Sequence, residues 1–362
     1  MAILHSSLNE KSQSLLARED ELVQRESALR SKEAELKRRF AELETRVSEL
    51  KTRKSKYEDS EKRLRAMVEA HNRNEFVAAL CVVSWDSIVL KTKLGAGSFA
   101  SVYKGIWRGT QVAVKKPFTS ADNPIHGLLD SDSSDLFLRE MKLLSKLRHP
   151  NIVQTMAACM EPENMCMIME LCRSSLHTLL QDSAIYLSPK KLIGFAIDAT
   201  QALLYLHTHS PPLLHRDLKT ANMMLSTNGS VKLIDFGYAS FVGETDFVYT
   251  QHKLAEKANK GTPSYMAPEC LKNEEVTTKS DIFSLGTVFW ELLTRKSPWA
   301  GKTPEHIYAE VTTGNRLAIP DDPAFPTAFG ELISACWLET PDDRPSAKNV
   351  LKVLRGIRKV VA

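Results

Sequence analysis

Residues 213–225 read LLHRDLKTANMML, and this stretch carries the polar residues Asp217, Lys219 and Asn222 between leucines and methionines. Two other short stretches follow it in the chain, KLIDFGYAS at 232–240 and GTPSYMAPE at 261–269. Each of them alone is a weak signal, because a short motif needs a structural context to carry meaning. Chance does not easily supply all three in this order, so the residues upstream become decisive.

A glycine loop, a lysine and a glutamate precede these three stretches. Residues 91–104 read KTKLGAGSFASVYK and contain Gly95 and Gly97, and no glycine or proline stands before them in the chain. Two glycines in a strand-rich region are often only a tight hairpin. The sequence VAVKK then puts Lys115 on a predicted strand, and FLREMKLL puts Glu140 on a predicted helix.

Hydrophobic periodicity gives the order of the structural elements after the first 80 residues. Apolar and polar residues alternate over a first set of stretches, which predicts strands at 84–94, 100–109, 110–118 and 165–172. Helical spacing predicts helices at 135–147, 189–209, 277–294 and 331–337. Strands first and helices later indicate an α+β fold with a small β-rich lobe and a larger α-rich lobe. The cleft between two such lobes is a natural ligand site.

Taken together, the glycine loop, the strand lysine, the helix glutamate and the HRD, DFG and APE stretches resemble the protein kinase family. The resemblance covers about residues 85–356. It implies the two-lobed protein kinase fold, with a small β-rich N-lobe and a larger α-rich C-lobe. It also implies an enzyme that uses ATP and Mg²⁺ and transfers the γ-phosphate to Ser or Thr hydroxyls of protein substrates. Such phosphoryl transfer demands positioning and charge neutralisation more than covalent chemistry.

The resemblance gives catalytic roles to a small set of charged residues. Asp217 is expected to accept the proton of the substrate hydroxyl, and Lys219 is expected to stabilise the transferred γ-phosphate. Lys115 is expected to contact the α- and β-phosphates while Glu140 holds it as an ion pair. A lone strand lysine or helix glutamate is ordinarily a solvated charge, so these roles rest on the whole set of motifs.

The same resemblance implies how the nucleotide and its metal ion are held. Glycine at positions 95 and 97 lets backbone N–H groups approach phosphates without interference from a Cβ atom. Asn222 and Asp235 offer the oxygen ligands that Mg²⁺ prefers. The expected nucleotide-binding residues are Leu94, Gly95, Gly97, Ser98, Val102, Ala113, Lys115, Met169, Glu170, Cys172 and Met224.

Within that set, Met169 is the expected gatekeeper, and the hinge runs through Glu170 and Cys172. The residues expected to sandwich the adenine are Val102, Ala113 and Met224. Apolar residues of this kind would also suit an ordinary core, so their roles depend on alignment with the motifs.

Scaffold roles are implied for other residues of the motif set. Asp281 in KSDIFSLG is expected to brace the catalytic loop, and Glu269 is expected to pair with Arg344. The residues expected to stack as a hydrophobic spine are Leu144, His215 and Phe236. These roles concern the fold and not the reacting groups.

Two features depart from the family pattern. Ala100 stands where a third loop glycine is usual, and its methyl group is tolerated as long as the backbone φ stays negative. Residues 116–134 form a long acidic, serine-rich loop before the first helix, which is more typical of a surface insertion than of a docking site.

Two alternative functions remain beside the serine/threonine kinase. One is a catalytically weak kinase-fold scaffold that binds partners through its N-terminal helix, and the complete set of catalytic residues disfavours it. The other is a tyrosine kinase. Lys219 in LKTAN and Thr262 in GTPSYMAPE resemble serine/threonine kinases instead, and the overall pattern is closest to the tyrosine-kinase-like group. Tyr238, directly after DFG, is a large aromatic residue of the kind that favours serine over threonine acceptors in this family.

The N-terminal part of the chain carries a seven-residue repeat. An apolar residue recurs at Leu8, Leu15, Leu22, Leu29, Leu36, Leu43, Leu50, Tyr57 and Leu64. Such a row predicts a long helix with one apolar seam and favours a coiled coil. The second core column is mostly charged, so a solitary helix stabilised by i, i+4 pairs such as Glu35 with Arg39 is the alternative.

These patterns divide the chain into three expected regions. Residues 1–75 form a long charged helix of coiled-coil type, 76–86 a linker and 87–358 the protein kinase domain. A homodimer or a partner coiled coil is expected through residues 8–68. Two chains brought together in this way would phosphorylate each other faster, because the effective concentration rises.

Regulation is expected in the activation segment between Asp235 and Glu269. Arg216 precedes the catalytic aspartate and could pair with a phosphate on that segment. Thr245 and Thr250 are the favoured acceptors, whereas Thr262 is expected to help bind the substrate. Ser240 and Tyr249 are the other hydroxyl-bearing candidates in the segment.

Composition limits the remaining classes of protein. The formal charge of +4 is small beside 48 basic and 44 acidic residues, so it does not argue for nucleic acid or an anionic membrane as partner. The sequence contains no apolar run of the ~20 residues that a membrane span needs and no secretory signal, so a cytoplasmic location is expected. Six scattered cysteines without a CxxC pair suggest neither a zinc site nor a disulfide framework.

Overall fold

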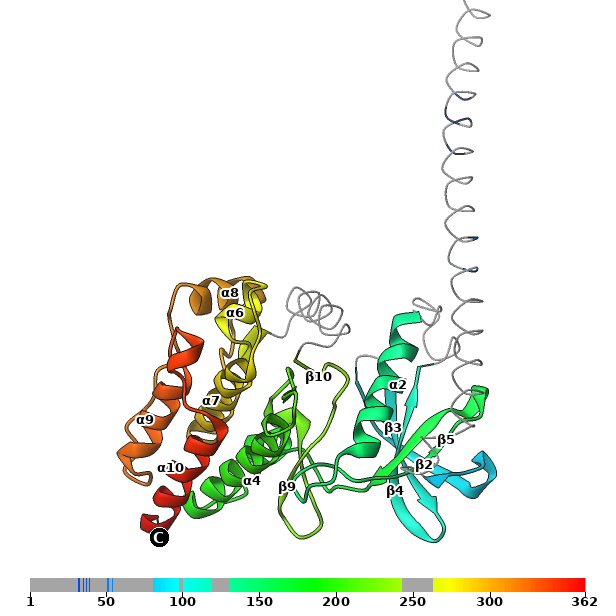
Figure 1. The fold of residues 1–362 in the computed structure, drawn as a ribbon, viewed down its shortest axis with the longest axis horizontal. Coiled ribbons are helices and arrows are strands. Elements are labelled where there is room, and N and C mark those ends of the chain that lie inside the picture. Colours follow the sequence, from blue (N-terminus) through cyan, green and yellow to red (C-terminus); the bar gives the residue numbers. More distant parts are fainter. Residues whose placement is uncertain are drawn as a thin grey trace, which may run out of the picture. The chain divides into compact units, whose positions relative to one another are not determined.

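The computed structural model describes residues 81–97, 100–118, 131–242 and 263–361, together with Lys32, Glu35, Lys37, Arg39, Lys51 and Lys54. The chain divides into two structural units, residues 1–64 and 65–362. Within the second unit a lobe built on a sheet precedes a helical lobe (Figure 1). The expected α+β order and the two-lobed architecture are therefore confirmed.

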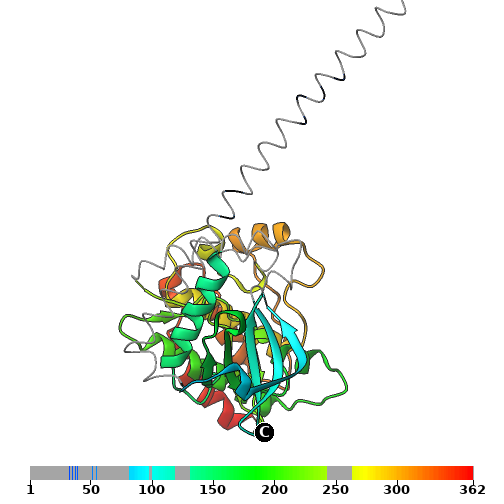
Figure 2. The same ribbon diagram turned by 90° about the vertical axis from the view of Figure 1, so that its right-hand side faces the viewer.

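The first lobe is built on one six-stranded sheet, whose strands lie toward the viewer in Figure 2. The strand order is β1-β5-β6-β4-β3-β2. The strands are β1 (Cys81–Val82), β2 (Ile88–Ala96), β3 (Ala100–Trp107), β4 (Thr110–Pro117), β5 (Thr155–Cys159) and β6 (Cys166–Glu170). Neighbouring strands are antiparallel except β1, which runs parallel to β5. Strands β2, β3, β4 and β6 fall on stretches where the sequence predicts strands.

The edge strand β1 corrects the expected linker at 76–86. Cys81 pairs with Ala157 in β5, and the side chain of Trp85 packs against the apolar core of the sheet. The ring of Trp85 also lies 4.1 Å from the ammonium of Lys116 on β4. Residues from 81 onward thus belong to the lobe. The linker interpretation is wrong there because a two-residue strand with exposed side chains leaves no periodic signal.

Helix α2 (Ser131–Lys146) packs beside β4. Its buried face carries Phe137, Met141 and Leu144 at helical spacing, and Glu140 lies on the same face. A buried carboxylate needs a partner, so this placement commits Glu140 to a cation from the sheet. The loop expected at 116–134 is shorter than predicted, because its first residues belong to β4 and its last residues to α2.

The second lobe is helical. Its helices are α3 (Leu176–Gln181), α4 (Pro189–His207), α6 (Pro268–Leu271), α7 (Thr278–Thr294), α8 (Pro304–Thr312), α9 (Thr327–Cys336) and α10 (Ala347–Val360). Helix α7 packs against α4 and α9 and is buried along nearly its whole length. A capping box formed by Thr277 and Ser280 starts it, and Arg295 in the left-handed region ends it. The predicted helices at 189–209 and 277–294 are confirmed, and α10 extends past residue 358.

Two pairs of short strands frame the segments that carry the HRD and DFG motifs. Strand β7 (Leu213–Leu214) pairs with β10 (Ser240–Phe241), and β8 (Met223–Leu225) pairs with β9 (Val231–Leu233). The 3-10 helix η3 (Thr220–Asn222) lies between β7 and β8. In the part of the chain that the structure describes, no helix is long and apolar enough to cross a membrane.

The six described residues of the N-terminal unit are helical and exposed. Glu35 and Arg39 form an ion pair of 2.9 Å at i, i+4 spacing, as expected for a charged helix. The row from Leu8 to Leu64, and with it the expected coiled coil, lies outside the described residues.

Candidate active site

A cleft of about 570 Å³ is lined by residues from β2, β3, β4 and α2 of the sheet lobe and from η3, β8 and the segment after β9. All of the expected site residues except Ser98 line this one cleft, and Ser98 lies outside the described residues. The lining residues from the prediction are Leu94, Gly95, Gly97, Val102, Ala113, Lys115, Glu140, Met169, Glu170, Cys172, Asp217, Lys219, Asn222, Met224 and Asp235.

Lys115 on β4 is buried between two carboxylates. Its Nζ lies 2.6 Å from both carboxylate oxygens of Glu140 and 3.6 Å from Oδ1 of Asp235. Burial alone would lower the pKa of Lys115, but the two carboxylates outweigh burial and raise it. The backbone N–H of Phe236 donates to Oε1 of Glu140 at 3.2 Å. Glu140 therefore joins β4 to the segment that carries the DFG motif.

Asp217, Lys219 and Asn222 meet at the floor of the cleft. The side-chain Nδ2 of Asn222 donates to the backbone oxygen of Asp217 at 2.8 Å and to its Oδ2 at 2.9 Å. The Nζ of Lys219 lies 3.1 Å from the same Oδ2. Because both side-chain contacts fall on Oδ2, the carboxylate of Asp217 has one defined orientation.

The backbone just before Asp217 is anchored on helix α7. The N–H groups of His215 and Arg216 donate to the two carboxylate oxygens of Asp281, each at 2.9 Å, and Nε2 of His207 lies 2.9 Å from Oδ2. Burial would raise the pKa of Asp281, but these hydrogen bonds and the nearby histidines outweigh it and lower the pKa. The expected brace is confirmed, and it holds Arg216 in the left-handed region with φ 64°.

His215 fixes the orientation of the next turn. Burial lowers the pKa of His215, so its ring is neutral at neutral pH. Its Nε2 lies 3.1 Å from the carbonyl oxygen of Ile234, and its Nδ1 accepts from the backbone N–H of Asp217 at 3.2 Å. These contacts place the ring hydrogen on Nε2. The ring also packs edge-on against Phe236 with centroids 4.8 Å apart, as predicted for the spine, and Leu144 is fully buried.

Gly95 and Ala96 at the end of β2, and Gly97 directly after it, line one wall of the cleft. A Cβ atom added at Gly95 would meet no protein atom within 4 Å. The packing of the described residues therefore does not require glycine at this position. Gly97 donates its N–H to the carbonyl of Ala100 at 2.8 Å. Ala100 stays outside the positive-φ region in β3, so its methyl group adds no backbone strain.

The hinge after β6 is tied to both lobes. The carboxylate of Glu170 accepts from the backbone N–H of Gln154 at 2.8 Å and pairs with Nζ of Lys232 on β9 at 2.7 Å. The backbone N–H of Glu170 also donates to the carbonyl of Gln154 at 3.0 Å, so both its side chain and its N–H are used by the protein. Burial raises the pKa of Cys172 to about 11, so this thiol stays protonated at neutral pH.

Part of the cleft wall is formed by residues that the sequence does not predict as site residues. The unpredicted lining residues include Val153, Leu171, Arg173, Ser174, Ser175, Thr178, Ala221 and Ile234. Ser175 is the N-cap of α3, because its Oγ accepts from the backbone N–H of Thr178 at 3.0 Å. A serine before a helical run indicates a cap from sequence alone, but nothing in the sequence places that cap at a cleft.

The buried carboxylate of Glu291 on α7 is hydrogen-bonded to the segment that carries Lys219 and Asn222. Glu291 is fully buried and accepts from the hydroxyls of Thr220 at 2.8 Å and Tyr265 at 2.6 Å, and Nδ1 of His177 lies 3.1 Å away. Burial and the charge of Glu291 raise the pKa of Tyr265, so the phenol remains a donor. The turn of η3 between Lys219 and Asn222 is thereby linked to α7.

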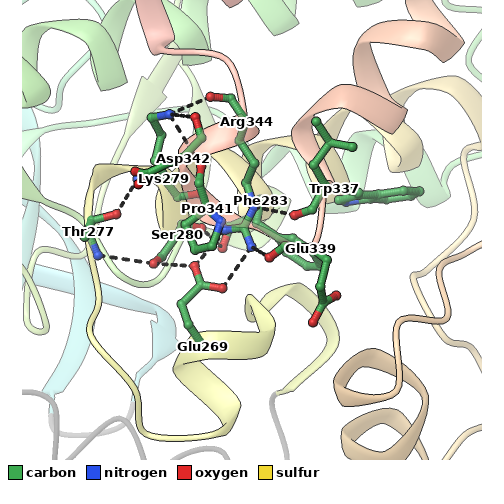
Figure 3. A network of polar contacts seen from close by, with 12 residues as sticks. Glu269, Thr277, Lys279, Ser280, Phe283, Trp337, Glu339, Pro341, Asp342 and Arg344 are labelled. Atoms are coloured by element: carbon green, nitrogen blue, oxygen red, sulfur yellow. Dashed lines mark hydrogen bonds and ion pairs between the residues drawn. The ribbon is translucent and has the colours of Figure 1, made fainter.

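Glu269, the last residue of the activation segment, forms a buried ion pair with Arg344 (Figure 3). The guanidinium of Arg344 donates to both carboxylate oxygens of Glu269, at 2.7 and 2.9 Å, as the sequence analysis expects. Arg344 also donates to the backbone carbonyl of Leu338 at 2.7 Å, and Ser280 donates to Glu269 at 2.7 Å. Burial would raise the pKa of Glu269, but the hydrogen bonds from Arg344 and Ser280 lower it.

The cleft combines fixed positive charge with fixed oxygen ligands. Lys115 and Lys219 carry ammonium groups that can compensate phosphate charge. Asn222 uses its amide nitrogen toward Asp217, so its amide oxygen is the atom that can serve a cation, and Asp235 adds a carboxylate. Two protein oxygens completed by phosphates and water suit Mg²⁺, which rarely occupies an all-protein cage. The described residues contain no cluster of three His, Cys, Asp or Glu side chains that could hold a metal.

Comparison with known families agrees with this site. The family "Protein tyrosine and serine/threonine kinase" matches residues 88–354, which is more than half of the chain. The protein therefore belongs to this family of protein kinases, and the predicted family is confirmed. Members of the family use ATP and, in general, Mg²⁺.

Several curated proteins are similar to this chain. The probable serine/threonine-protein kinase SIS8 of Arabidopsis thaliana is 36% identical over 285 residues, covering 78% of this chain and 26% of that protein. The probable serine/threonine-protein kinase drkD of Dictyostelium discoideum is 37% identical over 276 residues, with 76% and 20% covered. Serine/threonine-protein kinase CTR1 of Arabidopsis thaliana is 35% identical, with 76% and 32% covered. The chain thus spans a third or less of the length of these relatives.

We expect Arg344→Met to destabilise the fold strongly. The substitution leaves the carboxylate of Glu269 buried without its cation, which typically costs about 3–5 kcal/mol. Glu339→Gln is the matched control, because that carboxylate is 52% exposed and should contribute less than about 1 kcal/mol. Urea unfolding of the purified variants measures both. The double variant Arg344→Met with Glu269→Leu should recover part of the loss, and a double variant no more stable than the single one would contradict the explanation.

Acid should narrow the difference in free energy of unfolding between wild type and Arg344→Met, leaving the part that comes from the hydrogen bonds of Arg344 to backbone carbonyls. The pKa of Glu269 is lowered in the folded protein from its ordinary value of 4.5, so its stabilising effect is complete above that value. The effect is lost as the pH falls through the lower folded pKa. Unfolding experiments from neutral pH down to acid should therefore show the two free energies of unfolding converging below pH 4.5.

Proposed function

We propose that the chain is an ATP-dependent protein kinase that phosphorylates serine or threonine hydroxyls of protein substrates. One observation carries the proposal. The Lys115–Glu140–Asp235 cluster and the Asp217–Lys219–Asn222 cluster line the same cleft, so both sets of charges needed for phosphoryl transfer are present together. The serine/threonine class follows from the names of the relatives SIS8, drkD and CTR1, which are serine/threonine-protein kinases, and it agrees with Lys219 in the LKTAN stretch.

The proposed roles divide binding from chemistry. Lys115, kept in place by Glu140, neutralises phosphate oxygens of the nucleotide in the cleft. Asp217 accepts the proton of the attacking hydroxyl and orients its oxygen toward the γ-phosphate. Lys219 lies next to Asp217 and compensates the charge that develops on the transferred group. Holding the two reactants in line supplies much of the rate enhancement, because it removes their freedom to separate and rotate.

Asn222 and Asp235 are the residues that would hold Mg²⁺. When bound, the ion supplies positive charge that neutralises the phosphate oxygens during transfer. The protein's own contribution is to keep the amide oxygen of Asn222 directed by two hydrogen bonds and to keep the carboxylate of Asp235 near Lys115. The adenine is proposed to lie between Val102 and Met224, beside the hinge.

The main alternative is a kinase-fold scaffold with little activity. It predicts that nucleotide binding and partner binding survive the loss of Asp217. The intact Lys115–Glu140 pair argues for the enzyme, because a buried ion pair has a desolvation cost that a scaffold has no need to maintain. A phosphorylation assay with the purified full chain, ATP, Mg²⁺ and a peptide array decides between the two.

We expect Lys115→Met and Asp217→Asn each to lower the phosphorylation rate at least ~10²-fold. The first removes a phosphate contact and the second removes the base. Matched controls are Lys91→Met and Asp321→Asn, which change exposed residues outside the cleft and should retain the wild-type rate. Thermal unfolding checks that each variant is folded. Turnover like the wild type in either folded cleft variant would refute these roles.

The acceptor preference is proposed to depend on Tyr238. This residue is buried directly after the DFG motif, and its ring suits an acceptor that lacks the extra methyl group of threonine. Peptides that differ only in serine, threonine or tyrosine at the acceptor position should be phosphorylated fastest at serine. Tyr238→Leu should raise the threonine rate relative to the serine rate. Equal rates at serine and threonine in the wild type would disprove the preference.

Phosphorylation of the activation segment is proposed as the regulatory step. Burial and the nearby charge of Arg139 lower the pKa of Arg216 to about 10, although Asp281 raises it, so Arg216 remains charged at neutral pH. A phosphate on Thr245 or Thr250 would relieve the repulsion between the two guanidinium groups.

The N-terminal helix, residues 1–75, is proposed to pair two chains and so to raise the rate of this phosphorylation in trans. We expect the triple variant Leu36→Lys, Leu43→Lys and Leu50→Lys to lose self-association and to autophosphorylate more slowly at low protein concentration. The control Thr45→Lys with Thr52→Lys places lysines in a column away from the leucine row and should behave like the wild type. Sedimentation velocity and the concentration dependence of autophosphorylation are the measurements. Identical behaviour of the triple variant and the wild type would exclude the coupling.

A further inference from the structure

Helix α10 presents an outer face that the kinase site does not use. Its inner face packs against α4 and α9 through the buried residues Ala347, Val350, Leu351, Leu354 and Ile357. The remaining side chains of the helix are exposed along its length of about 20 Å. Figure 1 shows α10 in the helical lobe, at the end remote from the sheet and α2.

The exposed side chains fall into two stripes. Lys348, Lys352, Arg355 and Lys359 follow each other at i, i+4, i+7 and i+11, so they lie on one side of the helix. The residues one position after each of them form a parallel uncharged stripe of Asn349, Val353, Gly356 and Val360. Val353 is 40% and Val360 72% exposed, although valine is ordinarily a core residue. We call these two stripes together the α10 basic face.

The segment that forms the α10 basic face contains no acidic residue. The chain contains no aspartate or glutamate after Asp343. The four basic residues make no ion pair or hydrogen bond with any side chain in the described part of the chain. Of the helices packed against α10, α4 contributes Asp198, whose nearby cation is Arg358 at the border of the face, and α9 contributes Glu331.

We propose that the α10 basic face docks on the anionic surface of a phospholipid bilayer. Clusters of four to eight Lys and Arg residues on an amphipathic helix are typical of binding to anionic lipid headgroups. The exposed valines add the apolar contact with the headgroup boundary that such helices make. The occupant is chosen by charge complementarity and shape. The face is a helix surface, and its basic residues line neither the cleft of the candidate active site nor the smaller pocket beside Leu293 and Phe325.

A lipid surface suits this face better than a peptide or a nucleic acid does. An acidic peptide would need a groove to bury side chains, and single-stranded nucleic acid is usually held by aromatic residues that stack on bases. The outer face of α10 contains no aromatic residue. The overall charge of +4 gives no indication of the α10 basic face, because positive and negative charges in the other segments largely cancel. The positive charges of α10 are grouped on one surface instead.

Docking through α10 leaves the cleft accessible. The residues of the cleft come from the sheet lobe and from the segments near β8 and β9, and none of them belongs to α10. A kinase held in this way would meet membrane-bound substrates at raised effective concentration. The inference stands on the surface of α10 alone, so it is independent of the proposed phosphorylation activity.

The test compares two charge-matched variants of the full chain. Phosphatidylcholine vesicles, and vesicles with roughly a third phosphatidylserine, are sedimented with the protein at low and at physiological salt. The α10 variant carries Gln at Lys348, Lys352, Arg355 and Lys359. The control variant carries Gln at the exposed residues Lys91, Lys93, Lys296 and Lys302, which lie in other parts of the fold. The control is needed because the predicted N-terminal helix has basic residues of its own.

We expect wild type and control to bind the phosphatidylserine vesicles. The α10 variant should lose at least ~10²-fold in partition coefficient, because each basic residue near an anionic surface contributes roughly 1 kcal/mol, or about fivefold. Val353→Asn with Val360→Asn keeps the charge and should weaken binding several-fold. This second variant and the salt dependence keep the test decisive if the α10 variant unfolds. Wild type that ignores the vesicles, equal losses in both Gln variants, or α10-dependent binding only to polyglutamate or RNA would each overturn the proposal.

Discussion

A carboxylate without access to water must be satisfied by the protein itself, and Asp281 is the carboxylate on which the active-site backbone depends. Its two oxygens take the N–H groups of His215 and Arg216, so the loop is positioned by main-chain contacts and not by the side chains that do chemistry. This arrangement also maintains the left-handed conformation of Arg216, which costs about 1 kcal/mol or more when unsupported. The conformation in turn directs Asp217 into the cleft.

Helix α7 carries this constraint because it is buried along nearly its whole length. It supplies Asp281 to the loop before Asp217, Glu291 to the turn after it and Ser280 to the network of Glu269 and Arg344. These three polar side chains are buried and therefore expensive to desolvate, and each is satisfied by hydrogen bonds. The apolar residues of α7 pack in the core of the helical lobe. Its polar residues fix the positions of the site segments to which they are hydrogen-bonded.

The sequence predicts most strands and the clustering of the charged site residues, but it does not predict every element or every residue of the cleft. The strands β2, β3 and β4 follow from alternation, and the clustering of Lys115, Glu140, Asp217 and Asp235 follows from motif resemblance. Strand β1 was not predictable, because two exposed residues carry no period. Ser175 and Thr178 were missed at the cleft because a capping pattern says how a helix begins and not what it faces. The basic face of α10 was missed because net charge is a sum over the chain, whereas a surface depends on how a helix orients its residues.

Glu140 Oε1 is shared: it accepts from Nζ of Lys115 at 2.6 Å and from the backbone N–H of Phe236 at 3.2 Å. If α2 moves outward, it withdraws the same atom from a strand lysine and from the DFG segment at once. The backbone N–H of Phe236 would lose this acceptor and Lys115 would lose its short contacts with Glu140 while keeping the longer one with Asp235, so such half-broken states are high in energy. The helix, the lysine and the phenylalanine are therefore expected to change position as one cooperative unit, with two populated arrangements and little between them.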